Sequence, residues 1–159
     1  MKDDVEICEC QPEEVDDSLK ELWLSLAREM FEIEHFILLS EANSERWVKF
    51  VHEGLASKRN FLLVAKANKR LVGFALASIP KDYPLDVAES VGIINDVYVL
   101  PEFRGKGIGK KLVMECLKIM KFHKVTAVRL IVLAQNETAI KLYEKLGFKA
   151  YQYGMIKRL

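Results

Sequence analysis

A run of alternating glycines and basic residues is the segment with the clearest capacity for chemistry. Gly105, Gly107 and Gly109 are interleaved with basic residues just after the apolar segment 97–100. This order is typical of a strand, a tight turn and the start of a helix, where free backbone N–H groups meet the positive end of the helix dipole. Glycine also lets the backbone approach a ligand closely. The run therefore predicts a turn that binds phosphate.

The spacing of these glycines excludes two common phosphate-binding motifs. A dinucleotide fingerprint needs G-x-G-x-x-G after the first strand, with an acidic residue about 20 residues later. Here the pattern is G-x-G-x-G, at least three strands are expected before it, and the next strand ends in L-A-Q at 133–135. A mononucleotide loop needs G-x-x-x-x-G-K-[ST], but the G-K pair at 109–110 is followed by another lysine. A different phosphate ligand is expected.

The hydrophobic pattern predicts the elements that position the turn. Helices are predicted where apolar residues recur at helical spacing, and strands where they alternate or form β-branched runs. The predicted order is strand, two helices, three strands, helix, strand, helix and strand, at residues 5–10, 12–31, 44–55, 61–67, 71–79, 91–99, 107–122, 125–133, 136–146 and 148–159. The turn then lies between the fourth strand and the third helix, in a fold of α+β character.

Length, cysteine count and hydropathy limit the class of protein. The 159 residues correspond to a single domain, 1–159, with room for a core. The sequence contains no apolar stretch of about 18 residues, so we expect no membrane span. Its polar, acidic start does not resemble a secretory signal. Cys8, Cys10 and Cys116 form no C-x-x-C pair, which is typical of reduced cytoplasmic thiols. We expect a cytoplasmic protein without a membrane partner, and the histidine spacing predicts no metal site.

The net charge of +1 conceals an uneven distribution. Residues 1–56 contain 15 Asp/Glu and 5 Lys/Arg, whereas residues 57–159 contain 8 and 19. A basic half suits an anionic ligand and an acidic half a cationic one. The lysines are scattered without a series of aromatic residues for base stacking, so we expect no nucleic-acid partner.

A second motif follows the glycine-rich turn after about 30 residues. Residues 136–148 have the form N-x-x-A-x-x-L-Y-x-x-x-G-F, and residues 104–109 the form R-x-x-G-x-G. Together these segments resemble the two signature motifs of the GCN5-related N-acetyltransferase (GNAT) superfamily. The resemblance is strong over residues 91–150 and rests on element order alone over the first 90. It implies a mixed, mostly antiparallel sheet, splayed between strands 4 and 5 and flanked by about four helices.

The resemblance also implies the donor, acetyl-CoA, and residues that would hold it. The turn would bind the pyrophosphate, the fourth strand would pair with the pantetheine arm as a peptide adds to a sheet edge, and the second motif would contact the donor. Tyr143 would protonate the departing thiolate. The implied donor-binding residues are Val97, Tyr98, Val99, Arg104, Gly105, Lys106, Gly107, Ile108, Gly109, Lys110, Asn136, Ala139 and Tyr143.

Two alternatives exist for the group that removes the proton from the amine. Many relatives have a glutamate two residues before the position of Val97, but this chain has Asn95, which cannot act as a base. Asp96 is the next candidate, although adjacent strand residues point to opposite faces unless a β-bulge intervenes. The two alternatives are Asp96 as the base and proton removal through ordered water.

The acceptor is predicted to be a primary amine that attacks the thioester directly in a ternary complex. The implied acceptor side carries acidic groups, which favours a cationic amine such as a polyamine, a lysine side chain or a peptide N-terminus. The short C-terminal segment predicts an open groove, or one completed by a partner subunit, and its strand could pair across a homodimer. Two other functions stay open: a non-catalytic CoA-binding or regulatory module, and transfer of a different acyl group. The residues that the acceptor side is expected to contain are Glu29, Glu32, Glu34, His35, Glu41, Asp82, Asp86 and Glu89.

Overall fold

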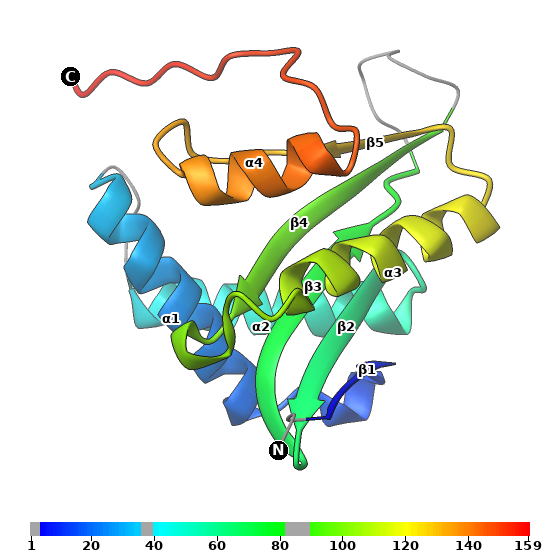
Figure 1. The fold of residues 1–159 in the computed structure, drawn as a ribbon. Coiled ribbons are helices and arrows are strands. Elements are labelled where there is room, and N and C mark those ends of the chain that lie inside the picture. The colour runs from blue at the N-terminus through cyan, green and yellow to red at the C-terminus, as the bar shows by residue number, and fades with distance from the viewer. Residues whose placement is uncertain (1–3, 36–39, 82–89) are drawn as a thin grey trace.

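A computed structural model describes residues 4–35, 40–81 and 90–159 and shows one five-stranded mixed sheet. The strands lie in sequence order, with antiparallel pairs up to the fourth strand and a parallel pair between the last two (Figure 1). The strands are β1 (Val5–Glu9), β2 (Asn60–Ala67), β3 (Arg70–Ser78), β4 (Val91–Val99) and β5 (Ala127–Leu130). The helices are α1 (Asp17–Ile33), α2 (Glu41–Ala56), α3 (Ile108–Phe122) and α4 (Glu137–Lys145).

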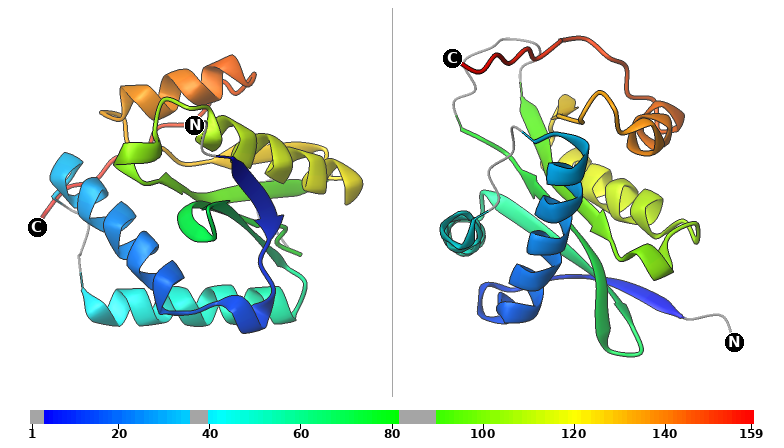
Figure 2. Two further views of the ribbon diagram at one scale, coloured as in Figure 1. Left: turned by 60° about the horizontal axis from the view of Figure 1, so that its bottom comes forward. Right: turned by 90° about the vertical axis from the view of Figure 1, so that its left-hand side faces the viewer.

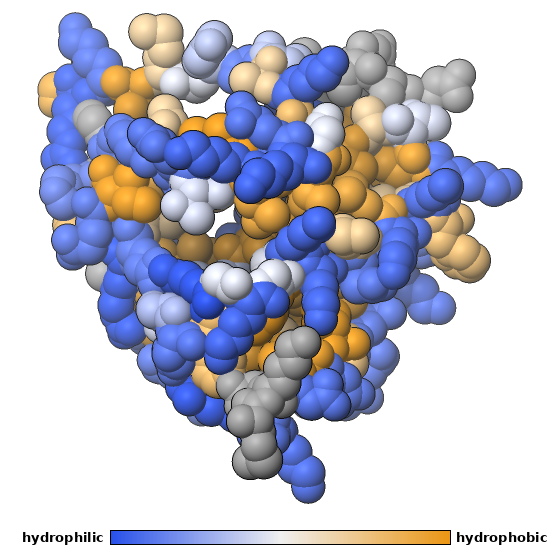
Figure 3. Space-filling view, in the orientation of Figure 1, coloured by the Kyte–Doolittle hydropathy of each residue, from blue (hydrophilic) through white to orange (hydrophobic). Residues whose placement is uncertain are grey.

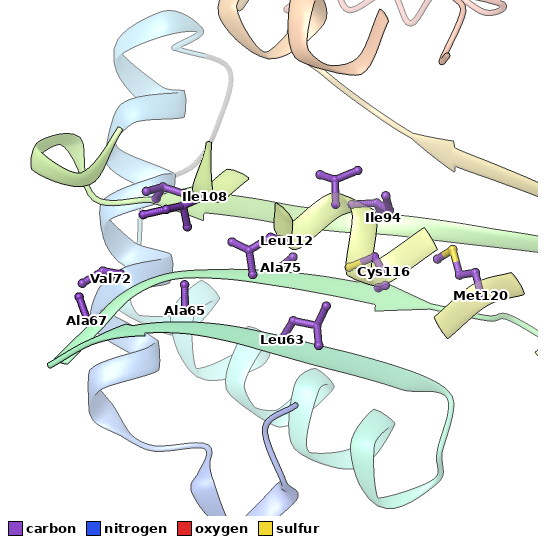
Figure 4. Close-up of a cluster of buried hydrophobic side chains, with 13 residues drawn as sticks. Leu63, Ala65, Ala67, Val72, Ala75, Ile94, Ile108, Leu112, Cys116 and Met120 are labelled. Carbon is purple, nitrogen blue, oxygen red and sulfur yellow. The ribbon is translucent and has the colours of Figure 1, made fainter. Parts of the chain in front are cut away.

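The helices divide the core into two parts. Figure 2 shows α1 and α2 on one face of the sheet and α3 on the other. Against α1 and α2, the buried aromatic residues Trp47, Phe74 and Tyr98 pack with leucines and valines. Against α3, aliphatic residues such as Leu112 and Met120 fill the core (Figure 4). The sheet therefore has two buried faces, and each face of β4 leads to a different set of helices.

The first two helices begin elsewhere than the sequence pattern predicts. The predicted helix start at Pro12 is wrong, because residues 12–14 form a separate 3-10 turn. α1 begins after Asp16, whose carboxylate accepts hydrogen bonds from the N–H groups of Ser18 and Leu19. α2 begins three residues earlier than predicted because the Ser40 side chain caps it.

β4 and β5 separate partway along their length. β5 pairs with residues 91–94 of β4, and no pair between the two strands follows Ile94, although β4 continues to Val99. From residue 95 onward, the edge of β4 that faces β5 therefore has no strand partner among the described residues, although the Val99 carbonyl accepts a hydrogen bond from Arg104 Nε at 2.8 Å. The predicted splay between the fourth and fifth strands is confirmed.

The end of the chain differs from the predicted pattern. β5 has four residues, fewer than the 125–133 predicted, and no residue of the described segment 146–159 lies in a strand. Tyr153 and Met155 are at least 90% exposed. Alternating apolar residues form a strand only where a neighbouring backbone pairs with them, and here the segment 148–159 makes no such ladder. The expected sixth strand is thus absent from the described part of this chain.

Candidate active site

The glycine-rich turn adopts the backbone that phosphate binding requires. Gly105 and Gly107 have positive φ angles of 75° and 78°, in the left-handed region where side chains are disfavoured. No side chain caps α3, and its first backbone hydrogen bond runs from Lys111 N–H to the Gly107 carbonyl. The N–H groups at positions 108–110 therefore have no acceptor among the described residues, at the positive end of a 15-residue helix. This arrangement can bind an anion.

The turn lies beside the other predicted donor-binding elements. A Cβ atom at Gly109 would lie 3.8 Å from Leu142 of α4 and 3.8 Å from Val99 at the end of β4. The start of α3, the free edge of β4 and α4 therefore meet at one place. Figure 3 shows a hollow with a hydrophobic floor and a hydrophilic rim in this central region, where Figure 1 shows β4 between α1 and α3.

Two of the basic side chains around the turn lie over aromatic rings. The Lys106 ammonium is 4.9 Å from the ring centre of Phe103, and the Arg104 guanidinium carbon is 5.3 Å from that of Tyr98. Arg104 also contacts Glu29 of α1: its Nη2 donates to both Glu29 carboxylate oxygens at 2.8 Å. Lys110 is exposed at the start of α3. The basic rim predicted from the sequence is thus present, but Arg104 is engaged with an acidic side chain.

A β-bulge lies in the middle of β4. Asp96 pairs with Leu76 of β3, whereas Ala77, the next residue of β3, pairs with Ile94. Asn95 is therefore an additional residue on β4, and its side-chain oxygen accepts a hydrogen bond from the Ser78 hydroxyl at 2.8 Å. This is the irregularity on which the interpretation of Asp96 depends.

The bulge decides how the residues before it are oriented relative to Asp96 and the residues after it. Val97 and Val99 pack against the core on the α3 side, so strict alternation would place residue 94 on the opposite face. Ile94 nevertheless belongs to the α3-side core. The extra residue thus places Ile94 on the α3 side, while Asp96, next to Val97, points toward α1 and α2, into the aromatic part of the core.

Asp96 has an unusual electrostatic environment there. The Trp47 indole N–H donates to its carboxylate at 3.0 Å, and Trp47 itself stacks on Trp23 with ring centres 5.7 Å apart. Burial raises the pKa of the Asp96 carboxyl above its usual range, and the Trp47 hydrogen bond, which stabilises the ionised form, opposes this rise. A carboxylate with a raised pKa can accept a proton closer to neutral pH.

Tyr143 of α4 has a side chain suited to donate a proton. It packs against Phe148 at the edge of the α3-side core, and its hydroxyl has no hydrogen-bond partner among the described residues. Burial raises the Tyr143 pKa, and the charges of Asp96 and Cys116 raise it further. The hydroxyl therefore stays protonated at neutral pH.

Asn136 has a structural role in α4. Its side-chain oxygen accepts the Ala139 N–H at 3.2 Å, so it caps the helix that carries Tyr143. The side-chain amide nitrogen of Asn136 donates to no described residue. Donor contact by Asn136 and Ala139 stays a prediction, but the cap explains why this residue type fits the start of the motif.

Of the predicted acceptor-side acids, Glu29 lies beside the site. The Tyr98 hydroxyl donates to Glu29 at 2.9 Å, and burial together with this carboxylate raises the Tyr98 pKa to about 12. Glu32, Glu34 and His35 lie at the end of α1, and Glu41 at the start of α2 forms an ion pair with Lys20; Asp82, Asp86 and Glu89 lie outside the described residues.

Sequence reasoning missed two partners. Trp47 has the helical spacing of a core residue, and nothing in its sequence context indicates a bond to Asp96. The link between Glu29 and Arg104 joins residues 75 positions apart. Within the described ranges, no cluster of three metal-ligating side chains could hold a metal ion, and no helix has the length and apolar character needed to cross a membrane.

Comparison with known proteins agrees with this geometry. A family model described as the acetyltransferase (GNAT) family matches residues 17–148. The resemblance implied a mixed sheet in which β4 and β5 separate, with a glycine-rich turn at the start of α3, and the structure has both. The chain belongs to the acetyltransferase (GNAT) family.

Several curated relatives are named as acetyltransferases. The spermidine N(1)-acetyltransferase of Thermoplasma acidophilum is 31% identical over 139 residues, which cover 81% of each chain. The mycothiol acetyltransferase of Paenarthrobacter aurescens is 38% identical over 89 residues, 55% of this chain but only 27% of that protein. The chain thus spans about a quarter of the latter relative and most of the former.

Solved structures share the fold. The BH1408 protein of Bacillus halodurans matches with a TM-score of 0.79 and 21% identity, over 97% of this chain and 99% of that one. The aminoglycoside acetyltransferase AAC(6')-Iy, solved with a bisubstrate analogue of CoA, matches with a TM-score of 0.73 and 18% identity, over 98% and 97%. At this identity the likeness establishes the fold.

Replacement of Asp96 by asparagine should stabilise the protein in a pH-dependent way. Because the folded-state pKa of Asp96 is raised, the stability that its protonated form contributes is lost as the pH rises through that pKa. Asparagine does not titrate and keeps an oxygen that accepts the Trp47 N–H. We expect Asp96→Asn to raise the free energy of unfolding by about 1 kcal/mol at pH 8 and by less at pH 5.

Urea denaturation across this pH range measures the effect. Asp4→Asn, the same change at an exposed position near the start of β1, is the control and should show no such trend. An equal stability change at both pH values in Asp96→Asn would contradict the assigned environment.

Proposed function

We propose that the protein is an acetyl-CoA-dependent N-acetyltransferase that transfers the acetyl group to a cationic primary amine. One observation carries this proposal: the free N–H groups at the start of α3, the unpaired edge of β4 and the unpartnered Tyr143 hydroxyl converge where β4 and β5 separate. Membership of the GNAT family supports the same reaction.

The donor would lie along the start of α3 and the unpaired edge of β4. Its pyrophosphate would accept hydrogen bonds from the N–H groups at 108–110, with positive φ at Gly105 and Gly107 keeping side chains away. The amide-containing pantetheine arm would pair with the free β4 edge from residue 97 to 99, as an added strand does. The acetyl group would then lie near the bulge, between Asp96 on one side and Tyr143 on the other.

The reaction then follows from the chemistry of the groups. The amine nitrogen forms a bond to the thioester carbonyl carbon, and the negative charge that develops on oxygen is stabilised by a β4 backbone N–H. The C–S bond breaks as the intermediate collapses. Asp96 accepts the proton that the ammonium must lose before it attacks. Tyr143 donates its proton to the departing thiolate and recovers one from the nitrogen of the intermediate. The two environments suit these opposite roles, since one group is a carboxylate with a raised pKa and the other a tyrosine that stays protonated.

A cationic acceptor is supported by the charge of the neighbouring helices. Residues 1–56, which include α1 and α2, contain 15 of the 23 acidic residues of the chain, and Glu29 lies directly beside the site. The relative from Thermoplasma acidophilum is named for acetylation of spermidine, a polyamine. A polyamine or a lysine-type amine fits this side of the molecule.

An acceptor panel tests the proposal directly. Thiol release from acetyl-CoA is measured with polyamines, aminoglycosides, peptides with free N-termini and lysine peptides. Turnover with at least one of these cationic amines is expected. CoA binding without turnover on any amine would instead indicate a non-catalytic CoA-binding module.

Tyr143→Phe tests the proton donor. Loss of the hydroxyl should lower kcat by about 100-fold, the usual scale for a general acid, while the Kd for CoA stays unchanged because the ring and its packing remain. Tyr151→Phe, an identical change at an exposed tyrosine of the C-terminal segment, serves as the control. Undiminished turnover of Tyr143→Phe at neutral pH would exclude Tyr143 as the acid.

Trp47→Phe tests Asp96 as the base. The Trp47 N–H lowers the Asp96 pKa, so its removal should raise that pKa further and move the acidic limb of the kcat/KM profile to higher pH. Trp23→Phe changes the stacked partner without touching Asp96 and should leave the limb in place. An unmoved limb in a folded Trp47→Phe protein would favour proton removal through ordered water.

A further inference from the structure

Glu29 of α1 holds the arginine that the sequence motif assigns to the donor pyrophosphate. Arg104 Nη2 lies 2.8 Å from both oxygens of the Glu29 carboxylate, and Arg104 Nε donates to the Val99 carbonyl at 2.8 Å. The Tyr98 hydroxyl donates to the same carboxylate at 2.9 Å. An anionic group of the protein therefore sits on the side chain expected to meet an anionic ligand.

The contact is strong in geometry but weak in energy. The Arg104 and Glu29 side chains are 46% and 40% exposed, so solvent screens their attraction. A pyrophosphate carries more charge than a carboxylate and offers more oxygens in the fork geometry that a guanidinium recognises. It also arrives beside the free N–H groups at 108–110, only a few residues away on the same turn. A phosphate ligand can thus replace the carboxylate on Arg104.

We propose that Glu29 is an internal anion that occupies Arg104 until the donor pyrophosphate replaces it, and that the released carboxylate then binds the ammonium group of the acceptor. This inference rests on the proposed function and deepens it. Arg104 exchanges one anionic partner for another. Glu29 keeps its hydrogen bond from Tyr98, which holds the carboxylate beside β4 and the bulge.

The exchange couples the two substrates. Before the donor binds, the Arg104 charge neutralises Glu29, so the carboxylate attracts a cation weakly. After the donor binds, the same carboxylate is uncompensated and faces the acceptor side of the molecule. Donor and cationic amine therefore favour one another's binding, without any movement of the helices, and by reciprocity the amine also strengthens donor binding.

The Kd for CoA, measured by calorimetry, tests the first half. Because the donor no longer has to displace an anion, Glu29→Gln should bind CoA about two- to five-fold more tightly than the native protein. Glu21→Gln makes the same change on the same helix at an exposed side chain and should leave the Kd unchanged. Pantetheine lacks the phosphates, so its affinity, measured by displacement of CoA, should be equal in all three proteins.

The Arg104→Gln protein shows whether Glu29 affects CoA binding through Arg104 or through a general effect of its charge. In Arg104→Gln, the additional change Glu29→Gln should no longer alter the CoA Kd, whereas a long-range field effect would persist. Weaker CoA binding in Glu29→Gln would overturn the inference, because Glu29 would then position Arg104 for the donor. A Kd equal to that of Glu21→Gln would overturn it as well, while the proposed function would stand. A native protein that binds no CoA would overturn both.

Spermidine, as a probe for cationic amines, tests the second half. It should bind the CoA complex of the native protein about five-fold more tightly than the protein alone, and Glu29→Gln should abolish this difference. The absence of such a difference in the native protein would overturn the release of Glu29. Unfolding temperatures of the variants confirm that each is folded, since neither Glu29 nor Glu21 is buried.

Discussion

The separation of β4 from β5 after Ile94 is the constraint on which the site depends. As long as the two strands pair, their backbone groups satisfy one another and leave nothing for a ligand. Once they part, β4 presents beside α3 a row of N–H and C=O groups that have no strand partner among the described residues, and the first N–H groups of α3 are also free. The fold therefore concentrates unsatisfied backbone hydrogen-bonding groups in one place, and an amide- and phosphate-containing ligand is the chemistry that satisfies both kinds.

The bulge at Asn95 adds a titratable side chain to this backbone site. In a regular strand with Val97 and Val99 on the α3 side, residue 94 would face α1 and α2, and the α3-side core would lose Ile94. The extra residue keeps Ile94 in the α3-side core, while Asp96 on the other face accepts the Trp47 N–H. The bulge thus leaves one residue of β4 unpaired with β3, and in return an apolar side chain and a carboxylate each lie on the face that suits them.

Local features of the sequence predicted the glycine-rich turn and the helix that begins after Asn136, whereas tertiary contacts could not be predicted from it. The glycines at 105 and 107 have positive φ angles, and Asn136 caps a helix. Both features depend only on residues that are close in sequence, so a short segment is enough to predict them. The Trp47 bond to Asp96 spans 49 residues, and it depends on how α2 packs on the sheet. The strand expected after residue 147 failed for a related reason: alternation shows that a segment can pair, but only the fold shows whether a partner edge is there.

The uneven charge of the chain acquires a structural meaning at Glu29 and Arg104. The acidic N-terminal part supplies α1 and α2, and the basic part supplies the turn and α3. These two parts meet across the site, where the exposed ion pair between Glu29 and Arg104 joins them. An ion pair of this kind adds little to stability, so its position matters more than its strength. It places the charge that suits an amine in contact with the charge that suits a phosphate. The occupancy of one ligand site can thereby alter the electrostatic character of the other.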